Sequence, residues 1–251
     1  MSSTATFILE KIIQTINYML GKGYGTSSIK TEFRLSYSLL DKPAAIILDV
    51  GANIGIYTAE AVSKIPNAQI HLFEPSKSNF AKLQSRFAGN PNIHLNNLAI
   101  SDISGVANLY TDEYGSGLAS LTKRKLEHFD ISYDKSEVIT TIRLEEYWNN
   151  TLHRSVIDLL KIDIEGHELD ALESLGDGIA HVKIVQFEFG GCNIDTKTYF
   201  QNFWYFFQKN NFDVYRISPL GLIKISRYSE SDEVFLTTNY LAANKSIVNL
   251  S

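Results

Sequence analysis

Short apolar runs alternate with segments of helical periodicity from residue 46 onward. The runs are rich in β-branched residues, as buried strands are, and lie at residues 46–50, 69–74, 93–98, 156–164 and 181–189. Amphipathic segments that follow these runs, such as residues 56–62 and 76–87, predict helices. Strands that alternate with helices build a parallel sheet covered on both faces. The pattern therefore predicts a doubly wound α/β fold.

Residues 105–148 break this alternation. Residues 106–110 and 138–144 alternate in polarity and carry β-branched residues, which predicts two added strands. Between them lies a polar, glycine-containing tip at residues 112–117. Connections of this length are commonly lids or binding loops. We therefore expect this insertion, and residues 110–138 within it, to contact the substrate.

The two ends of the chain carry their own patterns. Apolar residues recur at helical spacing over residues 7–20, with Lys11 as the one cation between them. This pattern favours a surface helix that covers the core over one that lies on a membrane, which would carry a basic band. Residues 28–40 predict a second helix. The expected N-terminal helical segment, residues 1–45, therefore packs on the core.

The C-terminal part predicts the last strands at residues 214–218, 222–225 and 233–238. An aromatic-rich helix at residues 198–208 precedes them, and its stripe is typical of core packing. The polar residues 241–251 predict a frayed tail. One domain, residues 46–240, is the economical interpretation.

Composition narrows the class of protein. The 251 residues are 44% hydrophobic and 20% charged, as in an ordinary globular domain, and the net charge is −5, without the clustered basic face of a nucleic-acid-binding protein. The single cysteine, Cys192, excludes an intramolecular disulfide and a cysteine-based zinc site. No apolar run reaches the ~18 residues of a membrane span, and no signal peptide is evident. We expect a cytoplasmic protein, and the sequence favours no particular oligomeric state.

The first strand ends in Asp49 and leads into a loop that contains Gly51, Asn53 and Gly55. A strand, a tight glycine loop and a helix are how an open α/β sheet builds a nucleotide site. The spacing is not the dinucleotide fingerprint, and no P-loop lysine follows. A plain connection between a strand and a helix remains the alternative.

The second strand ends in Glu74, which is followed by Pro75. An acid at this tip, about 20 residues after the glycines, is placed to accept hydrogen bonds from both hydroxyls of a ribose. The alternative is that Glu74 merely caps the helix that begins at Ser76. The agreement of loop and acid favours a nucleoside ligand.

Three ordered motifs carry a resemblance to a known family: Leu48-Asp49-Val50-Gly51-Ala52-Asn53-Ile54-Gly55, Phe73-Glu74-Pro75, and Leu160-Lys161-Ile162-Asp163-Ile164-Glu165-Gly166-His167-Glu168. With them the chain resembles the class I S-adenosylmethionine (SAM) methyltransferases, and within these the FkbM family, over residues 32–240. The resemblance implies a Rossmann-like, mostly parallel seven-stranded sheet. It also implies SAM as cofactor and O-methylation of a hydroxyl on a sugar, a glycan or a glycosylated natural product.

The resemblance assigns cofactor contacts to residues at the strand ends. These are Asp49, Gly51, Asn53, Gly55 and Glu74, and, at the adenine edge, Ala99, Ser101 and Asp102. Asp102 is equally well explained as a turn residue. Tyr24 and Glu32 are weaker candidates, since a surface helix also accounts for them. SAM has no phosphate groups, which agrees with the missing P-loop lysine.

An alcohol acceptor must lose a proton, which calls for a general base or a metal ion. Asp163 and Glu188 end neighbouring strands, so they either raise one another's pKa or share a divalent cation such as Mg²⁺, with Asn193 as the nearest third ligand. His167 offers a base without a metal, or is a solvated residue in a first helical turn. Asp163 is the favoured essential group.

Two other functions stay open from the sequence. An NAD-linked sugar oxidoreductase or epimerase shares the strand–loop–helix pattern, but it would want a third glycine. A SAM-binding module without catalysis is the other. The intact acids Asp163, Glu165 and Glu188 favour an enzyme over such a module. The expected partner is a small-molecule or glycan acceptor.

Overall fold

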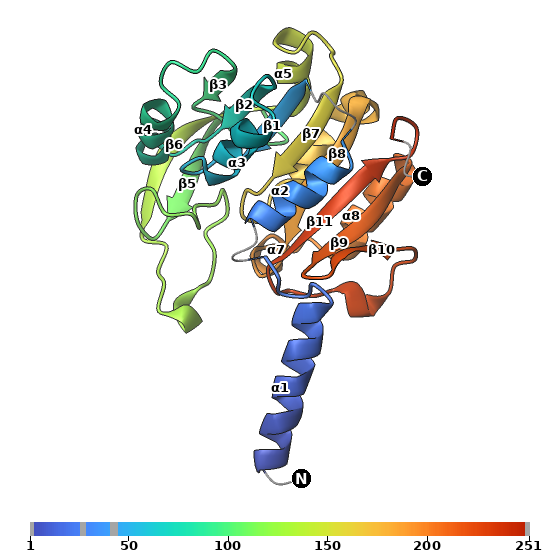
Figure 1. The fold of residues 1–251 in the computed structure, drawn as a ribbon. Helices are drawn as coiled ribbons and strands as arrows, with labels where there is room; N and C mark the ends of the chain where they lie inside the picture. The colour runs from blue at the N-terminus through green and yellow to red at the C-terminus, as the bar shows by residue number, and fades with distance from the viewer. Residues whose placement is uncertain (1–2, 26–28, 41–44, 249–251) are drawn as a thin grey trace.

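A computed structural model describes residues 3–25, 29–40 and 45–248. The parts of the expected N-terminal segment and tail at residues 1–2, 26–28, 41–44 and 249–251 lie outside the described residues. An eight-stranded sheet forms the centre, in the order β10-β9-β11-β8-β7-β1-β2-β3 (Figure 1). Its strands are β1 (Ile46–Val50), β2 (Gln69–Phe73), β3 (Ile93–Asn96), β7 (Ile157–Ile162), β8 (Val182–Phe189), β9 (Phe212–Ser218), β10 (Gly221–Ile225) and β11 (Thr238–Asn244).

The five strands predicted from the apolar runs, β1, β2, β3, β7 and β8, pair in parallel. The last three strands pair antiparallel. The sheet is therefore mixed and has eight strands, where a mostly parallel sheet of seven was expected.

The last strand differs from its expected place. It was predicted at residues 233–238, but β11 runs from Thr238 to Asn244 and lies between β8 and β9. Tyr240, Leu241, Ala242 and Ala243 are fully buried there, so the frayed tail predicted from residue 241 is wrong for these residues. Alanine has little intrinsic preference for strands, and it is burial between two neighbouring strands that decides the structure here.

Helices cover both faces of the sheet, which confirms the doubly wound arrangement. They are α2 (Ile29–Ser38), α3 (Ile56–Lys64), α4 (Lys77–Arg86), α5 (Leu144–Asn150), α6 (Glu168–Ser174), α7 (Cys192–Thr196) and α8 (Phe200–Lys209), with short 3-10 helices at Glu127–Phe129, Gly176–His181 and Glu230–Asp232. One core cluster lies under α2, α3 and α4, and another lies under α5, α6 and α8. Phe203 and Phe207 of α8 pack against Phe187 at ring-centroid distances of 4.9 and 5.1 Å, so the aromatic stripe is core, as expected.

The insertion contains the two expected strands. These are β5 (Gly105–Thr111) and β6 (Lys135–Ile142), which pair antiparallel and form a small sheet with β4 (Ala99–Ile100). Between β5 and β6 the chain turns back, and Tyr110 exchanges backbone hydrogen bonds with Ser120. This fold-back keeps the polar part of the insertion beside the parallel strands.

The N-terminal helix α1 (Ser3–Met19) was expected to cover the core, but it does not. It projects away from the sheet (Figure 1), and its large apolar side chains are exposed. The second helix, α2, does pack on the sheet, and Phe33 within it is buried. Among the described residues, no helix has the length and apolarity to cross a membrane.

Candidate functional site

A cavity of about 570 Å³ lies at the carboxyl ends of β1, β2, β7 and β8, within the size range of small-molecule sites. This is where open α/β sheets bind ligands. Its lining comes from the glycine loop, the ends of β2 and β8, the loop after β7, the insertion and residues 235–237. The lining residues used below are Gly51, Asn53, Phe73, Glu74, Pro75, Leu98, Ala99, Ile100, Ser116, Gly117, Leu118, Arg124, His128, Phe129, Asp163, Glu165, His167, Glu188 and Asp195.

The glycine loop passes very close to the end of β7. Gly51 has a φ of +80°, and a Cβ at this position would lie 1.9 Å from the backbone oxygen of Asp163. No other residue type fits there. The backbone N–H groups of Gly51 and Ala52 both donate to the oxygen of Phe73, at 3.0 Å. Gly55 lies behind the cavity, where Phe87 and Leu83 of the α4 region fill the space of its missing side chain.

Glu74 joins the loop to the end of β2. Its Oε2 accepts a hydrogen bond from the Asn53 N–H at 2.8 Å, and its Oε1 accepts one from the Ser76 N–H at 2.9 Å. Glu74 therefore bonds to the residue that precedes α4 and also lines the cavity. Burial raises the pKa of Glu74 to about 7, although the two backbone N–H groups lower it. Each carboxylate oxygen can accept a further hydrogen bond, so both remain available to a ligand.

Asp49 lies beneath the loop and not among the residues that line the cavity. Its Oδ2 accepts a hydrogen bond from Thr58 at 2.6 Å, and its Oδ1 lies 3.2 Å from the Nζ of Lys161. The expected direct cofactor contact is therefore replaced by support of the loop from below. This follows from its place inside the strand, before the turn.

Lys161 is a residue that sequence reasoning missed. Its Nζ donates to the Gly51 backbone oxygen at 2.9 Å and lies 3.5 Å from the Oδ2 of Asp163. Burial lowers the pKa of Lys161, but the carboxylates of Asp49 and Asp163 outweigh this and raise it, so the side chain is a cation. A lysine inside an otherwise apolar strand was the available signal.

Of the three residues expected at the adenine edge, Ala99 lines the cavity, whereas Ser101 and Asp102 do not. Leu98 and Ile100 line the cavity beside Ala99. The Ser101 N–H donates to the backbone oxygen of Ile142 at 3.1 Å, and its hydroxyl donates to Asp102 at 3.0 Å. Ser101 and Asp102 therefore form the turn, as the alternative interpretation of Asp102 held. Ile142 belongs to β6, so this bond ties the turn to the insertion.

Asp163 and Glu188 both line the cavity, as their neighbouring strands predicted. Burial raises the pKa of Glu188 well above its ordinary value, and the charge of Asp163 raises it further. The side chain of Glu188 makes no hydrogen bond or ion pair with the residues that the structure describes, whereas Asp163 has Lys161 beside it. Of the two carboxylates, Glu188 is therefore the one without a cationic neighbour in the described part of the chain.

His167 lines the cavity, but other side chains engage both of its ring nitrogens. Nδ1 lies 2.7 Å from Asp170 and Nε2 lies 2.9 Å from the Thr122 hydroxyl. To act as a base, the imidazole must first give up one of these contacts. The geometry favours a role in holding the insertion against the first turn of α6.

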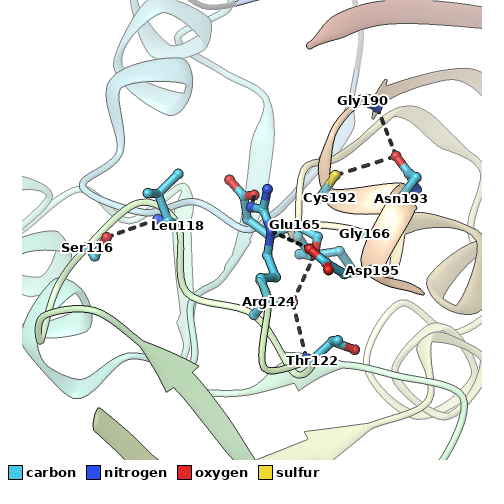
Figure 2. A network of polar contacts seen from close by, with 12 residues as sticks. Ser116, Leu118, Thr122, Arg124, Glu165, Gly166, Gly190, Cys192, Asn193 and Asp195 are labelled. Atoms are coloured by element: carbon cyan, nitrogen blue, oxygen red, sulfur yellow. Dashed lines mark hydrogen bonds and ion pairs between the residues drawn. The ribbon is translucent and has the colours of Figure 1, made fainter. Parts of the chain in front are cut away.

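The donor groups do not fit a Mg²⁺ site, which the sequence left open as the alternative to a general base. Within the described ranges, no three His, Cys, Asp or Glu side chains lie close enough to hold a metal ion. Lys161 already provides a cation beside Asp163. The Oδ1 of Asn193, the expected third ligand, accepts from the Gly190 N–H at 2.8 Å, and the side chain is buried (Figure 2).

Arg124 connects the insertion to the loop after β7 and to α7 (Figure 2). Its guanidinium pairs with Glu165, and its Nε lies 3.6 Å from the Oδ2 of Asp195 in α7. Burial and the charge of Asp163 raise the pKa of Glu165 to about 8, while Arg124 lowers it. Only the folded chain brings these residues together, so no local pattern marks Arg124.

The tip of the insertion reaches the glycine loop. A Cβ on Gly117 would lie 3.0 Å from the Nδ2 of Asn53, and Ser116, Gly117 and Leu118 line the cavity. His128 and Phe129 line it as well. The insertion is therefore part of the cavity wall.

The two weaker candidates lie elsewhere. Glu32 accepts a hydrogen bond from Gln186 at 2.9 Å within the buried contact between α2 and the sheet. The ring of Tyr24 packs edge-on against Tyr18 at 5.2 Å. Neither lines the cavity, whereas the neighbouring Gly25 does.

Comparison with known proteins identifies the family of the chain. The model of the FkbM methyltransferase domain matches residues 49–214. The chain is 27% identical over 173 residues to the 2-O-methyltransferase NoeI of Sinorhizobium fredii, covering 65% of this chain and 70% of NoeI. It is 26% identical over 153 residues to Methyltransferase 1 of Beauveria bassiana, covering 53% of this chain and 59% of the relative.

Solved structures show weaker likeness. An FkbM methyltransferase from Methylobacillus flagellatus aligns with 15% identity and a TM-score of 0.49, over 79% of this chain and 43% of that chain. The plantazolicin methyltransferase BpumL, in complex with SAH, aligns with 11% identity and a TM-score of 0.47, over 95% and 100% of the two chains. The family match spans the glycine loop, Glu74, the insertion, Asp163 and Glu188, and so most of the chain. The chain belongs to the FkbM methyltransferase family.

Proposed function

We propose that the chain is a SAM-dependent O-methyltransferase that acts on a hydroxyl of a sugar, a glycan or a glycosylated natural product. The observation that carries this proposal is the glycine loop pressed against β7, with the carboxylate of Glu74 bonded to it through Asn53. The name of NoeI, a 2-O-methyltransferase, supports oxygen as the acceptor atom.

The residues present fit the cofactor. The Gly51 oxygen, which accepts from Lys161, can accept a further hydrogen bond, and Glu74 has free acceptor sites for the two ribose hydroxyls. Phe73, Pro75, Leu98 and Ile100 form an apolar part of the cavity wall, which suits an adenine ring. Asp163 supplies a carboxylate for the cofactor's amino group.

When bound, SAM would supply an electrophilic methyl group on its sulfonium, with S-adenosylhomocysteine as the leaving group. Glu188 takes the proton that the hydroxyl loses. Burial raises the pKa of Glu188, which makes it a stronger base than an ordinary carboxylate. The contact of Arg124 with Glu165 and Asp195 holds the insertion over the site and limits the access of water.

An NAD-linked reductase of the kind weighed above would use a tyrosine and a lysine four residues apart. The chain has two such pairs, Tyr18 with Lys22 and Tyr205 with Lys209. None of the four residues lines the cavity. The geometry therefore favours methyl transfer.

The test is transfer of labelled methyl from SAM to a panel of free sugars, oligosaccharides and glycosides. Alkali-stable label on a saccharide oxygen, with release of one S-adenosylhomocysteine per methyl group, is expected. Label on nitrogen or carbon of a non-sugar acceptor contradicts the proposed acceptor class while leaving the cofactor assignment intact.

Replacing Glu74 with Gln is expected to weaken SAM binding by about 1.5–3 kcal/mol, because a charged acceptor of two hydroxyls becomes a neutral amide. The pKa of Glu74 near 7 adds a pH dependence. Since the ionised form is the better acceptor, wild-type affinity falls as the pH drops from 8 to 6, and the variant shows a flatter profile. Calorimetry measures both, and equal affinities at pH 8 remove Glu74 from the site.

Replacing Phe129 with Ala is expected to raise the acceptor KM about 3- to 10-fold, the effect of losing an aromatic contact, with unchanged SAM affinity. Phe129 lines the cavity and is 66% exposed, so its ring is free to pack on an acceptor. Tyr205→Ala is the matched control, since Tyr205 is equally exposed and lies away from the cavity. An unchanged KM in Phe129→Ala removes this residue from the acceptor site.

A further inference from the structure

The most unusual surface of the molecule is helix α1. It stands clear of the body (Figure 1), and Phe7, Ile8, Leu9, Ile12, Ile13, Ile16, Tyr18, Met19 and the following Leu20 are 39–59% exposed. Seven of these side chains, all except Phe7 and Tyr18, lie on one side of the helix, and an exposed apolar patch of this kind marks an interaction site. We propose that α1 pairs with α1 of a second copy of this chain. The proposal does not depend on the function proposed above.

The apolar residues of α1 follow a heptad. Leu9, Ile12, Ile16 and Met19 are spaced by three, four and three residues, the alternation that places side chains on the seam between two helices. Ile8, Ile13 and Leu20 flank this seam and widen it. A stripe of this kind on one helix is complementary to the same stripe on another, as a two-fold interface requires.

The base of α1 is fixed to the body. Arg216 donates from Nε to the backbone oxygen of Leu20 at 2.8 Å, and Lys22 donates from Nζ to that of Ser231 at 2.8 Å. The Gly23 N–H donates to the Thr238 hydroxyl at 2.9 Å. Several contacts from separate elements therefore hold the end of α1, and the helix is presented in a fixed direction.

The area suffices for a stable pair. The seven apolar side chains of the seam and its flanks are about half exposed and offer on the order of 600 Å² per chain, so a pair buries about 1,200 Å², above the ~1,000 Å² of a specific interface. This lies at the upper end of the range for the largest apolar patch on a typical monomer, about 300–600 Å². Because the two helices are identical in length, α1 of a second copy covers the stripe along its whole length.

The charges on α1 favour a helix over a lipid surface. Glu10 and Lys11 are its two charged residues between Ser3 and Met19, and they cancel. Gln14 and Asn17 share the face with them, opposite the apolar seam. A helix that lies on anionic lipid carries a band of Lys and Arg on its polar face, and α1 does not. A second apolar helix needs no such band.

Sedimentation equilibrium of the full chain tests the pairing. The expected mass at about 50 µM is twice the chain's 28.2 kDa, and Ile12→Glu/Ile16→Glu is expected to sediment as a monomer. Gln14→Glu/Asn17→Glu places two charges on the opposite face and is expected to stay paired. Because the side chains of Ile12 and Ile16 are about half exposed, near-UV circular dichroism and the Tm of the body are expected to match in all three proteins.

Two results overturn the inference. One is a wild-type chain that is monomeric at this concentration. If that monomer floats with phosphatidylcholine vesicles, α1 is assigned to a lipid surface. The other is a wild-type dimer that Ile12→Glu/Ile16→Glu leaves intact, which places the interface elsewhere. If Ile12→Glu/Ile16→Glu is monomeric but has lost the near-UV signal, the body has unfolded and Ile12→Ser/Ile16→Ser takes its place. This milder variant must be monomeric and keep the near-UV signal, and a dimer overturns the inference.

Discussion

Glu188→Gln is expected to lower kcat about 10²- to 10⁴-fold, the contribution of a positioned general base. The amide has nearly the same shape as the carboxylate but cannot take the proton that the acceptor hydroxyl loses. Because the group must be deprotonated to act, wild-type kcat rises with pH through the raised pKa of Glu188. The variant is expected to lose this rise.

Single-turnover methyl transfer with saturating SAM measures this effect, and calorimetry checks that SAM affinity stays within about threefold of wild type. Glu173→Gln is the control, because Glu173 is an exposed carboxylate on α6 that does not line the cavity. A Glu188→Gln variant that keeps more than a tenth of the wild-type rate, with the same pH profile, transfers the role of base to Asp163.

Lys161→Met is expected to lower the free energy of unfolding by about 3–5 kcal/mol, because it leaves the charge of Asp49 buried without its partner. It also removes the hydrogen bond to the Gly51 oxygen that holds the glycine loop. Adding Asp49→Asn removes the orphaned charge, so the double variant is expected to recover part of the loss. Urea unfolding measures all three proteins.

Lys224→Met is the matched control. Its ion pair with Asp213, at 2.6 Å, is exposed, and exposed pairs contribute at most about 1 kcal/mol. A loss in Lys161→Met no greater than in this control contradicts the account of Lys161 as the cation that holds the loop to the strand ends.

The sequence predicts best what local patterns encode. The buried strands that lead to the site, the glycine loop and the acid at the tip of β2 each follow from a pattern within ten residues. Gly51 is a clear case, since the close approach of the Asp163 oxygen demands the absence of a side chain. The strands β5 and β6 were also predicted, because a break in the alternation of strand and helix marks them.

What the sequence does not predict depends on contacts between distant segments. Ser101 was expected to contact the cofactor, but it does not line the cavity and its N–H is bonded to Ile142 of β6, 41 residues away. Arg124 reaches Glu165 in the loop after β7 and Asp195 in α7, and no local spacing marks this. The exposed placement of α1 is of the same kind, because an amphipathic pattern shows that a face is to be buried but not against what.

The proposal that this cavity binds SAM is tested most directly by calorimetric titration of the wild-type chain with SAM and, separately, with NAD. The account predicts one SAM bound per chain and no heat of binding from NAD. Binding of NAD without binding of SAM would contradict the assignment of the glycine loop and Glu74 to a SAM site.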